Sequence, residues 1–153
     1  MHILYKLLLV IHISAAALTL GSTTGLLRLL RRGLDAGQAA FALAAEDGAR
    51  RGKITGMSSM ATLWTGLSLI FVIGGFKVAP LNIHIALSLM LVAVVVSFTL
   101  MRPSMGRILA LSSAAPLDVA AVRGHMKKLA MGQGILHLLW LCILVLMLVR
   151  IEK

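Results

Sequence analysis

Four long apolar runs, separated by shorter polar segments, set the pattern of this chain. They cover residues 4–27, 54–76, 81–101 and 129–149. Each has the length of about 20 residues that an α-helix, rising 1.5 Å per residue, needs to cross a bilayer core of roughly 30 Å. The pattern predicts an all-α integral membrane protein, a four-helix bundle with a single four-span domain over residues 1–153.

Glycine and proline mark where these helices turn or end. Gly74-Gly75 and Pro80 predict a tight turn between the second and third spans. Pro103, preceded by an arginine, predicts that the third helix ends or bends there. Pro116 fits the first turn of a helix, so we expect the fourth helix to begin near residue 117, before it enters the membrane.

The connection between the first two spans has a pattern of its own. Residues 34–45 are rich in alanine, include Phe41 and are followed by acidic residues. A short helix lying on the membrane surface is the structure that we expect for this segment.

Composition supports a membrane protein and excludes an ordinary soluble domain. The chain is 59% hydrophobic and 13% charged, with a mean hydropathy of +0.98, whereas soluble domains carry about 25% charged residues. The net charge of +10 does not indicate a nucleic-acid partner, because all fifteen basic residues lie between the spans or at their ends. The lone Cys142 excludes a disulfide framework within one chain.

The basic residues are distributed unevenly between the two sides. The connections after the first and third spans hold eleven: Arg28, Arg31, Arg32, Arg50, Arg51, Lys53, Arg102, Arg107, Arg123, Lys127 and Lys128. The opposite side holds four: Lys6, Lys77, Arg150 and Lys153. The positive-inside rule therefore predicts that both connections are cytoplasmic and both termini are outside. Because three arginines follow the first run and none precedes it, we expect a retained span and not a signal peptide.

Three histidines lie inside the apolar runs. An ionisable side chain in hydrocarbon is costly, so it indicates a functional site. Counted from the outer ends of the spans, His12, His84 and His137 lie roughly 12, 5 and 18 Å deep. Two imidazoles on different helices at similar depth can hold a b-type haem within a bundle. We expect His12 to ligate the iron, with His84 as its partner and His137 as the substitute.

Small and polar residues share helix faces with these histidines. His12, Thr19 and Thr23 lie on one stripe of the first span. Comparable stripes contain Ser58, Thr62, Thr65 and Gly66 in the second span, His84 and Ser88 in the third, and Gln133 and His137 in the fourth. Such residues usually face other helices in a membrane, so we expect these faces to converge. The alternative is a cofactor-free accessory or assembly subunit in which the histidines only tie helices together.

Copper is a less favoured cofactor. The chain has nine methionines, and Met57 and Met60 are three residues apart. Thioether and imidazole ligands suit Cu(I), but methionine is also common packing material. Most of the methionines lie toward the cytoplasmic side and the buried histidines toward the outer side, which favours packing.

Acidic residues are absent from the four runs. Asp35, Glu46, Asp47, Asp118 and Glu152 all lie outside them. A proton-coupled transporter normally needs an intramembrane carboxylate, so this class is disfavoured. Phosphate-binding glycine loops and Ser–His–acid arrangements are absent as well, which disfavours hydrolases and phosphate-handling enzymes.

Several segments resemble a group of small bacterial membrane proteins that includes HemJ-type protoporphyrinogen oxidases, CopD-like copper-resistance proteins and uncharacterised four-span families. Arg28 follows His12 by sixteen positions, as in the first span of the HemJ type. Residues 65–69 and 82–87 resemble the group's second span and the start of its third. Residues 146–150 resemble the uncharacterised families most.

The resemblance implies haem binding through His12 in a bacterial inner membrane. HemJ-type proteins carry a lysine where this chain has His84. The resemblance therefore implies haem binding more directly than it implies protoporphyrinogen oxidation. Electron transfer, or a subunit role in a membrane redox complex, is the function that we expect, and a membrane haem oxidoreductase is left open. The expected partners are membrane lipid and redox proteins or a second copy.

The haem hypothesis also predicts which side chains lie around the macrocycle. Trp64, Trp140 and Tyr5 would pack near it or anchor the membrane interface. Lys6 or Lys77 would meet the propionates on the outer side, and Arg28 would do so if the haem lies deeper.

Overall fold

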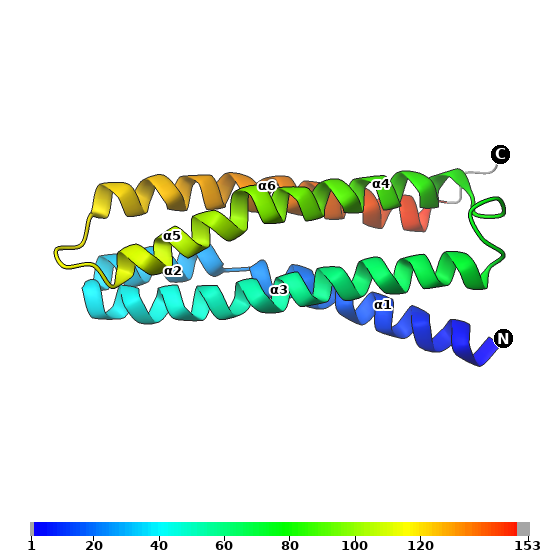
Figure 1. Ribbon diagram of the computed structural model, residues 1–153, viewed down its shortest axis with the longest axis horizontal. Helices are drawn as coiled ribbons and strands as arrows, with labels where there is room; N and C mark the ends of the chain where they lie inside the picture. Colours follow the sequence, from blue (N-terminus) through cyan, green and yellow to red (C-terminus); the bar gives the residue numbers. More distant parts are fainter. Residues whose placement is uncertain (1, 150–153) are drawn as a thin grey trace.

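The computed structural model describes residues 2–149, without the side chain of His2. All of its regular elements are helices, which run roughly along one long axis (Figure 1). They are α1 (His2–Thr23), α2 (Leu26–Ala36), α3 (Gln38–Val72), α4 (Leu81–Val96), the π-helix η1 (Ser97–Met101), α5 (Arg102–Ser112) and α6 (Val119–Leu148). The predicted all-α bundle is confirmed.

These elements form four long rods. The first combines α1 and α2, the second is α3, the third combines α4, η1 and α5, and the fourth is α6. Each rod is long and apolar enough to cross a membrane. The chain is therefore a multi-pass membrane protein, and its rods extend beyond the expected spans.

Glycines in the left-handed region set the turns. Gly25, with φ 77°, separates α1 from α2, and Gly37, with φ 108°, reverses the chain into α3. Gly74 and Gly75 have φ values of 117° and 86°, and the Gly75 N–H donates to the Ile70 carbonyl at 2.8 Å. An L side chain is strained at such φ values, so only glycine fits these sites readily. The predicted turn after the second span is confirmed.

The third rod bends where proline predicted it. Pro103 lies in the first turn of α5, directly after the five π-helical residues of η1. Proline lacks the N–H that would bond to the carbonyl four residues earlier, and its ring crowds that carbonyl. The wider turn of η1 accommodates the mismatch, and α5 leaves the axis of α4 (Figure 1).

The start of α6 also agrees with the expectation. Asp118 caps the helix, because its carboxylate accepts a hydrogen bond from the Ala121 N–H at 2.9 Å. An N-cap aspartate satisfies one of the free donors at a helix start. The helix begins at Val119, close to the predicted residue 117.

The expected surface helix at residues 34–45 is wrong. The segment belongs to two helices, since α2 ends at Ala36 and α3 begins at Gln38 and continues for 35 residues. The reversal at Gly37 brings α3 back against α2. Phe41 is fully buried there and does not lie on a membrane surface.

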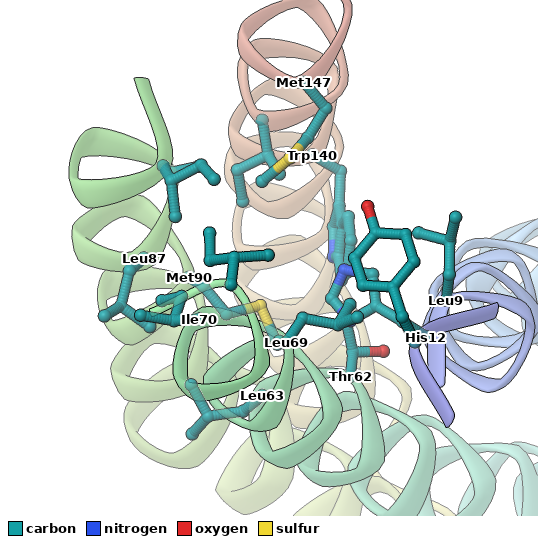
Figure 2. Close-up of a pocket in the computed structure, with 16 residues that line it drawn as sticks. Leu9, His12, Thr62, Leu63, Leu69, Ile70, Leu87, Met90, Trp140 and Met147 are labelled. Carbon is teal, nitrogen blue, oxygen red and sulfur yellow. The ribbon is translucent and has the colours of Figure 1, made fainter. Parts of the chain in front are cut away.

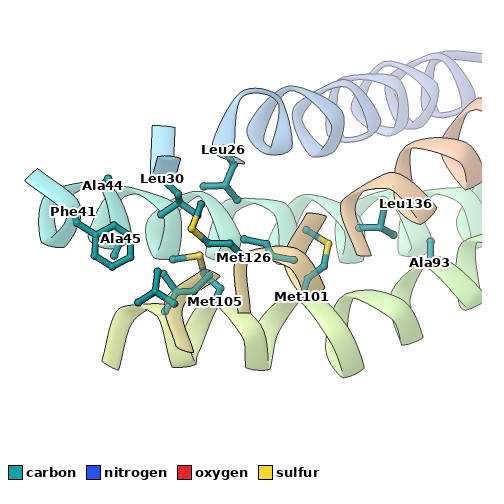
Figure 3. Packing of buried hydrophobic residues seen from close by; sticks show 13 residues of the cluster. Leu26, Leu30, Phe41, Ala44, Ala45, Ala93, Met101, Met105, Met126 and Leu136 are labelled. Carbon is teal, nitrogen blue, oxygen red and sulfur yellow. The ribbon is translucent and has the colours of Figure 1, made fainter. Parts of the chain in front are cut away.

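The two ends of the rods differ in packing. We call the end that holds α2, α5 and the 113–118 connection the basic end, and the end that holds the first turns of α1, the last turns of α6 and the 73–80 turn the terminal end (Figure 1). The main core lies largely at the basic end (Figure 3). Its buried members include Leu26, Leu30, Phe41, Ala44, Ala45, Met101, Met105, Ile108, Val122, Met126 and Leu129.

The terminal end is more open. There α1 packs along α3 and α4 packs along α6, and the two pairs have few contacts with each other. The N-terminal part of α1 diverges from the other rods (Figure 1). A smaller buried cluster, comprising Ala86, Met90, Trp140 and Ile143, joins α4 to α6. Many large apolar side chains remain exposed, as expected for surfaces that face lipid.

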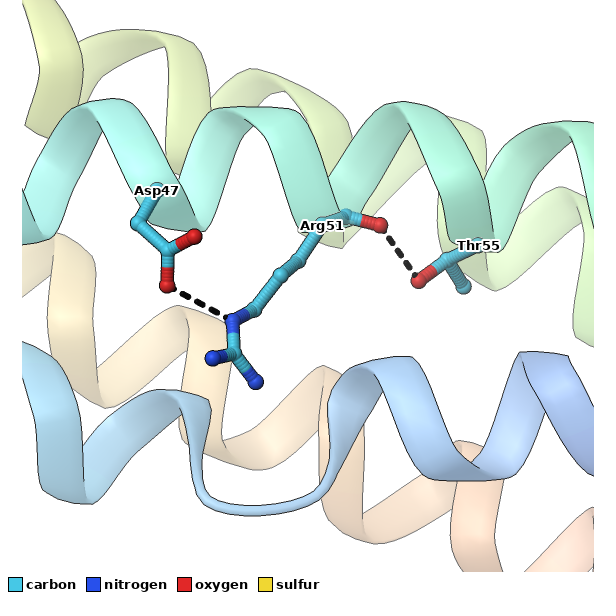
Figure 4. Close-up of polar contacts among 3 residues, drawn as sticks. All are labelled: Asp47, Arg51 and Thr55. Carbon is cyan, nitrogen blue, oxygen red and sulfur yellow. Dashed lines mark hydrogen bonds and ion pairs between the residues drawn. The ribbon is translucent and has the colours of Figure 1, made fainter.

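One ion pair occurs in the described part of the chain. The Arg51 Nε donates to Asp47 Oδ2 at 2.8 Å, one helical turn away on α3. The Thr55 hydroxyl donates to the Arg51 carbonyl at 2.9 Å, one turn further on (Figure 4). All other cations among residues 2–149 lack a carboxylate partner.

Candidate functional site

A pocket separates the two helix pairs at the terminal end. Its volume is about 180 Å³, and its walls come from α1, α3, α4 and α6. Most of the lining is aliphatic, with His12, Tyr5 and Trp140 among the exceptions and two thioethers, Met90 and Met147 (Figure 2). The pocket is therefore an apolar site with one imidazole.

The orientation of His12 is set by α3. Its Nδ1 lies 3.0 Å from the Thr65 Oγ1. The Thr65 hydroxyl has one proton, which it donates within its own helix to the Ala61 carbonyl at 2.6 Å. Thr65 must therefore accept from His12 Nδ1–H, and Nε2 of the neutral ring is left with a free lone pair.

A glycine makes room for this imidazole. A Cβ at Gly66 would lie 3.1 Å from the Cε1 of His12, closer than most such contacts. The ring thus lies against the bare backbone of α3. Thr65 and Gly66, which belong to the stripe predicted on the second span, thus both contact His12 of α1.

Hydroxyl pairs continue the contact between α1 and α3. The Thr19 hydroxyl donates to that of Ser58 at 2.9 Å, and the Ser58 hydroxyl donates to the Ile54 carbonyl at 2.8 Å. Ser22 and Thr55 share a hydrogen bond of 2.7 Å. These bonds join the polar faces that the sequence predicted to converge.

His137 is used differently. Its Nε2 lies 3.1 Å from the Thr23 Oγ1, which donates its own proton to the Leu20 carbonyl at 2.9 Å. His137 therefore donates to Thr23 and ties α6 to α1. The buried Gln133, one turn away, donates to the Thr23 carbonyl at 2.7 Å. Neither His137 nor Gln133 lines the pocket.

His84 lies apart from His12. Its Nδ1 is 3.2 Å from the Pro80 carbonyl and donates to it. Its ring centroid lies 6.0 Å from that of Phe76, at the turn before α4. His84 does not line the pocket, and Ser88 on the same face is exposed. The structure thus does not bring His12 and His84 to one pocket.

Of the other side chains expected around the haem, some line the pocket and others do not. Tyr5 and Trp140 line the pocket, but Trp64 is 66% exposed. Arg28 on α2 and Lys77 in the 73–80 turn are exposed and do not line the pocket. Among residues 2–149, no lysine or arginine side chain is part of the pocket wall.

The methionines of the pocket were not expected from the sequence. Met90 and Met147 resemble any other apolar residue of a span, and only the packing of α4 against α6 places them beside the pocket. Met57, considered for copper, is 74% exposed. Among residues 2–149, no three His, Cys, Asp or Glu side chains are grouped closely enough to hold a metal ion.

No protein-family model matches this chain, and comparisons with curated proteins and with solved structures found no match. The geometry around His12 is therefore the basis for a functional proposal.

Proposed function

We propose that this protein binds b-type haem in the pocket between its two helix pairs and acts in membrane electron transfer, with His12 as an axial ligand. The observation that carries the proposal is the state of His12. It lines an apolar pocket, its Nδ1–H is held by Thr65, and its Nε2 lone pair is free. A histidine ligand needs this arrangement, in which a hydrogen bond to one nitrogen fixes the tautomer and orients the other.

The pocket must widen to take a macrocycle. Its volume of about 180 Å³ is below the roughly 300–1,000 Å³ of typical ligand pockets. We expect the wall formed by α1 to move, because α1 has few contacts with α6 and its N-terminal part diverges from the other rods (Figure 1). Bound haem would supply a one-electron redox centre within the bilayer.

Methionine sulfur is the better second ligand in this arrangement. Met90 and Met147 line the pocket with His12, whereas His84 and His137 do not. Exchange of an imidazole for a thioether raises the reduction potential of a haem. We therefore propose ligation by His12 and one of these two methionines in place of two histidines.

The visible spectrum of the purified protein, after addition of haem, tests the proposal. We expect a Soret band in the wild type and its loss in His12→Ala. His137→Ala is the matched control, since His137 is also intramembrane and bonded to a threonine but does not line the pocket. Full haem retention by His12→Ala would contradict the assignment.

The second ligand requires a separate comparison. Met90→Leu and Met147→Leu keep the volume of the side chain but remove the sulfur, and His84→Leu tests the bis-histidine alternative. We expect one of the methionine variants to change the low-spin signal in electron paramagnetic resonance. A change in His84→Leu alone would restore the two-histidine assignment.

A cofactor-free accessory subunit is the second candidate, and two hydrogen bonds favour it. His12 bonds to Thr65 and His137 bonds to Thr23, so both histidines tie helices together. If this is their entire role, wild-type protein will take up no haem. His12→Ala will then lower thermal stability about as much as His137→Ala does.

We also propose that the basic end faces the cytoplasm, because eleven of the fifteen basic residues lie there. Cysteines at Ala115 and Lys77, in a chain carrying Cys142→Ser, test this with a membrane-impermeant maleimide. We expect Lys77→Cys to react in intact cells, and Ala115→Cys only after the membrane is opened. The reverse pattern would invert the orientation.

A further inference from the structure

A second cavity lies at the basic end, between α2 and α6. Its volume is about 400 Å³, and three cations line it: Arg31 of α2 and Arg123 and Lys127 of α6. Asp35 is the one carboxylate in the lining. We call this cavity the basic groove.

The cations of the basic groove are not neutralised within the chain. None of them takes part in an ion pair among residues 2–149, where the one such pair joins Arg51 to Asp47. All three are exposed, and Asp35 leaves the lining with a net charge of two positive units. Three cations converging on one groove provide the charge that binds a phosphate group.

The basic groove lies at the level where lipid headgroups are expected. Arg31 comes four residues after the first apolar run ends, and Lys127 comes two residues before the fourth begins. The rest of the lining is apolar, with Leu34, Met126 and Ala130. Cations beside apolar side chains, at the edge of two membrane spans, match a ligand that has an anionic head and an apolar tail.

We propose that the basic groove binds the phosphate headgroup of an anionic phospholipid, such as a phosphatidylglycerol. Arg31 and Arg123 hold the phosphate from opposite helices, and Lys127 adds a third charge. The acyl chains follow the apolar surface of α6 toward its exposed Met131 and Ile135. A free phosphate ion has the same charged group but gains nothing from this apolar surface. The lipid is therefore the ligand that the groove favours.

Thermal unfolding in a neutral detergent, with short-chain phosphatidylglycerol added, tests the proposal. We expect a rise in the midpoint temperature that is absent with phosphatidylcholine of the same chains and with inorganic phosphate at the same concentration. The groove variant carries Arg31→Gln, Arg123→Gln and Lys127→Gln, all at exposed positions. We expect it to fold and to lose the rise.

A control variant separates the groove from the general positive charge of this end. Arg50→Gln, Lys53→Gln and Arg107→Gln also remove three exposed cations, but none of these residues lines the basic groove. We expect this control to keep the full response to phosphatidylglycerol. If both variants lose the rise in midpoint temperature equally, phosphatidylglycerol is attracted by the general positive charge and not by a specific site. If inorganic phosphate raises the midpoint as much as phosphatidylglycerol does, the groove is an anion site that does not need a lipid. Either result overturns the proposal, and neither depends on haem.

Discussion

The basic end and the terminal end belong to the same four rods but are held together by different interactions. At the basic end, apolar side chains such as Leu30, Phe41 and Ile108 have no exposed surface. At the terminal end, α1 is joined to α3 by polar contacts such as the His12–Thr65 and Thr19–Ser58 bonds, and only a small apolar cluster joins α4 to α6. Apolar side chains there point largely outward.

The lengths of the rods account for this difference. With 35 residues, α3 is about 52 Å long, and it exceeds a bilayer core of roughly 30 Å by about 20 Å. Because the apolar run within α3 begins at residue 54, we expect the basic end to lie outside the hydrocarbon, where burial of apolar surface from water drives packing. Within lipid this driving force is missing, and helices associate through small residues and hydrogen bonds. The looser contacts leave space for the pocket beside His12.

The difference in packing between the two ends predicts the largest change in the free energy of unfolding for truncation of a core side chain. Leu30→Ala at the basic end should lower the free energy of unfolding by about 2–5 kcal/mol, because Leu30 is fully buried. Leu141→Ala at the terminal end removes the same atoms from a side chain that is 58% exposed, and we expect a change of less than about 1 kcal/mol. Unfolding in detergent measures both. Similar losses would show that the two ends are equally packed.

A smaller loss of stability should follow when a methyl group is added at a glycine that contacts another helix. A Cβ at Gly33 would lie 2.8 Å from the Cβ of Ala44 and 3.2 Å from the Cα of Phe41. Gly33→Ala should therefore cost about 1–3 kcal/mol, because the backbones of α2 and α3 must separate. Gly66→Ala meets only the imidazole of His12, a side chain and not a backbone, so we expect a cost of less than about 1 kcal/mol.

An open glycine provides the reference for this series. Nothing lies within 4 Å of a Cβ built at Gly106, in the middle of α5. Gly106→Ala should raise stability by up to about 1 kcal/mol through helix propensity alone. If Gly66→Ala is as damaging as Gly33→Ala, α1 is locked in place and the pocket wall cannot move.

The smallest effect concerns a single polar contact. A double-mutant cycle with Thr19→Val and Ser58→Ala should give a coupling of about 0.6 kcal/mol, typical of hydrogen bonds between membrane helices. Thr99 is the control, because it is exposed and bonds only to the Val95 carbonyl of its own rod. Thr99→Val combined with Ser58→Ala should be additive. A coupling near zero for Thr19 and Ser58 would place the adhesion of α1 to α3 elsewhere.

Much of the fold could be predicted because hydropathy reports directly on membrane spans. The long apolar runs, the Gly74-Gly75 turn and the bend at Pro103 all depend on local chemistry. The error at residues 34–45 arose because an alanine-rich segment with one aromatic fits a surface helix as well as a buried one. Burial of Phe41 depends on the reversal at Gly37 and on α5, which lies far away in the sequence.

For the candidate site, the sequence predicted which residues share a helix face but not how each helix is rotated in the bundle. Helical spacing placed His12 with Thr19, and Gln133 with His137, and these faces do meet across helices. The position of a residue along its own helix also followed from counting residues. Rotation of each helix about its axis did not, so His84 and Met90 on α4 could not be assigned to the pocket or away from it.

The break at Gly25 has a mechanical consequence. A continuous helix transmits torque along its length, but the chain from Thr24 to Gly25 lies outside both α1 and α2. These two residues therefore form a joint between α2, which is anchored in the dense core, and α1, which lies along α3 and is hydrogen-bonded to α6 through its last residue, Thr23. A rotation of α1 at this joint would change which of its side chains face the cavity while α2 stays packed in the core.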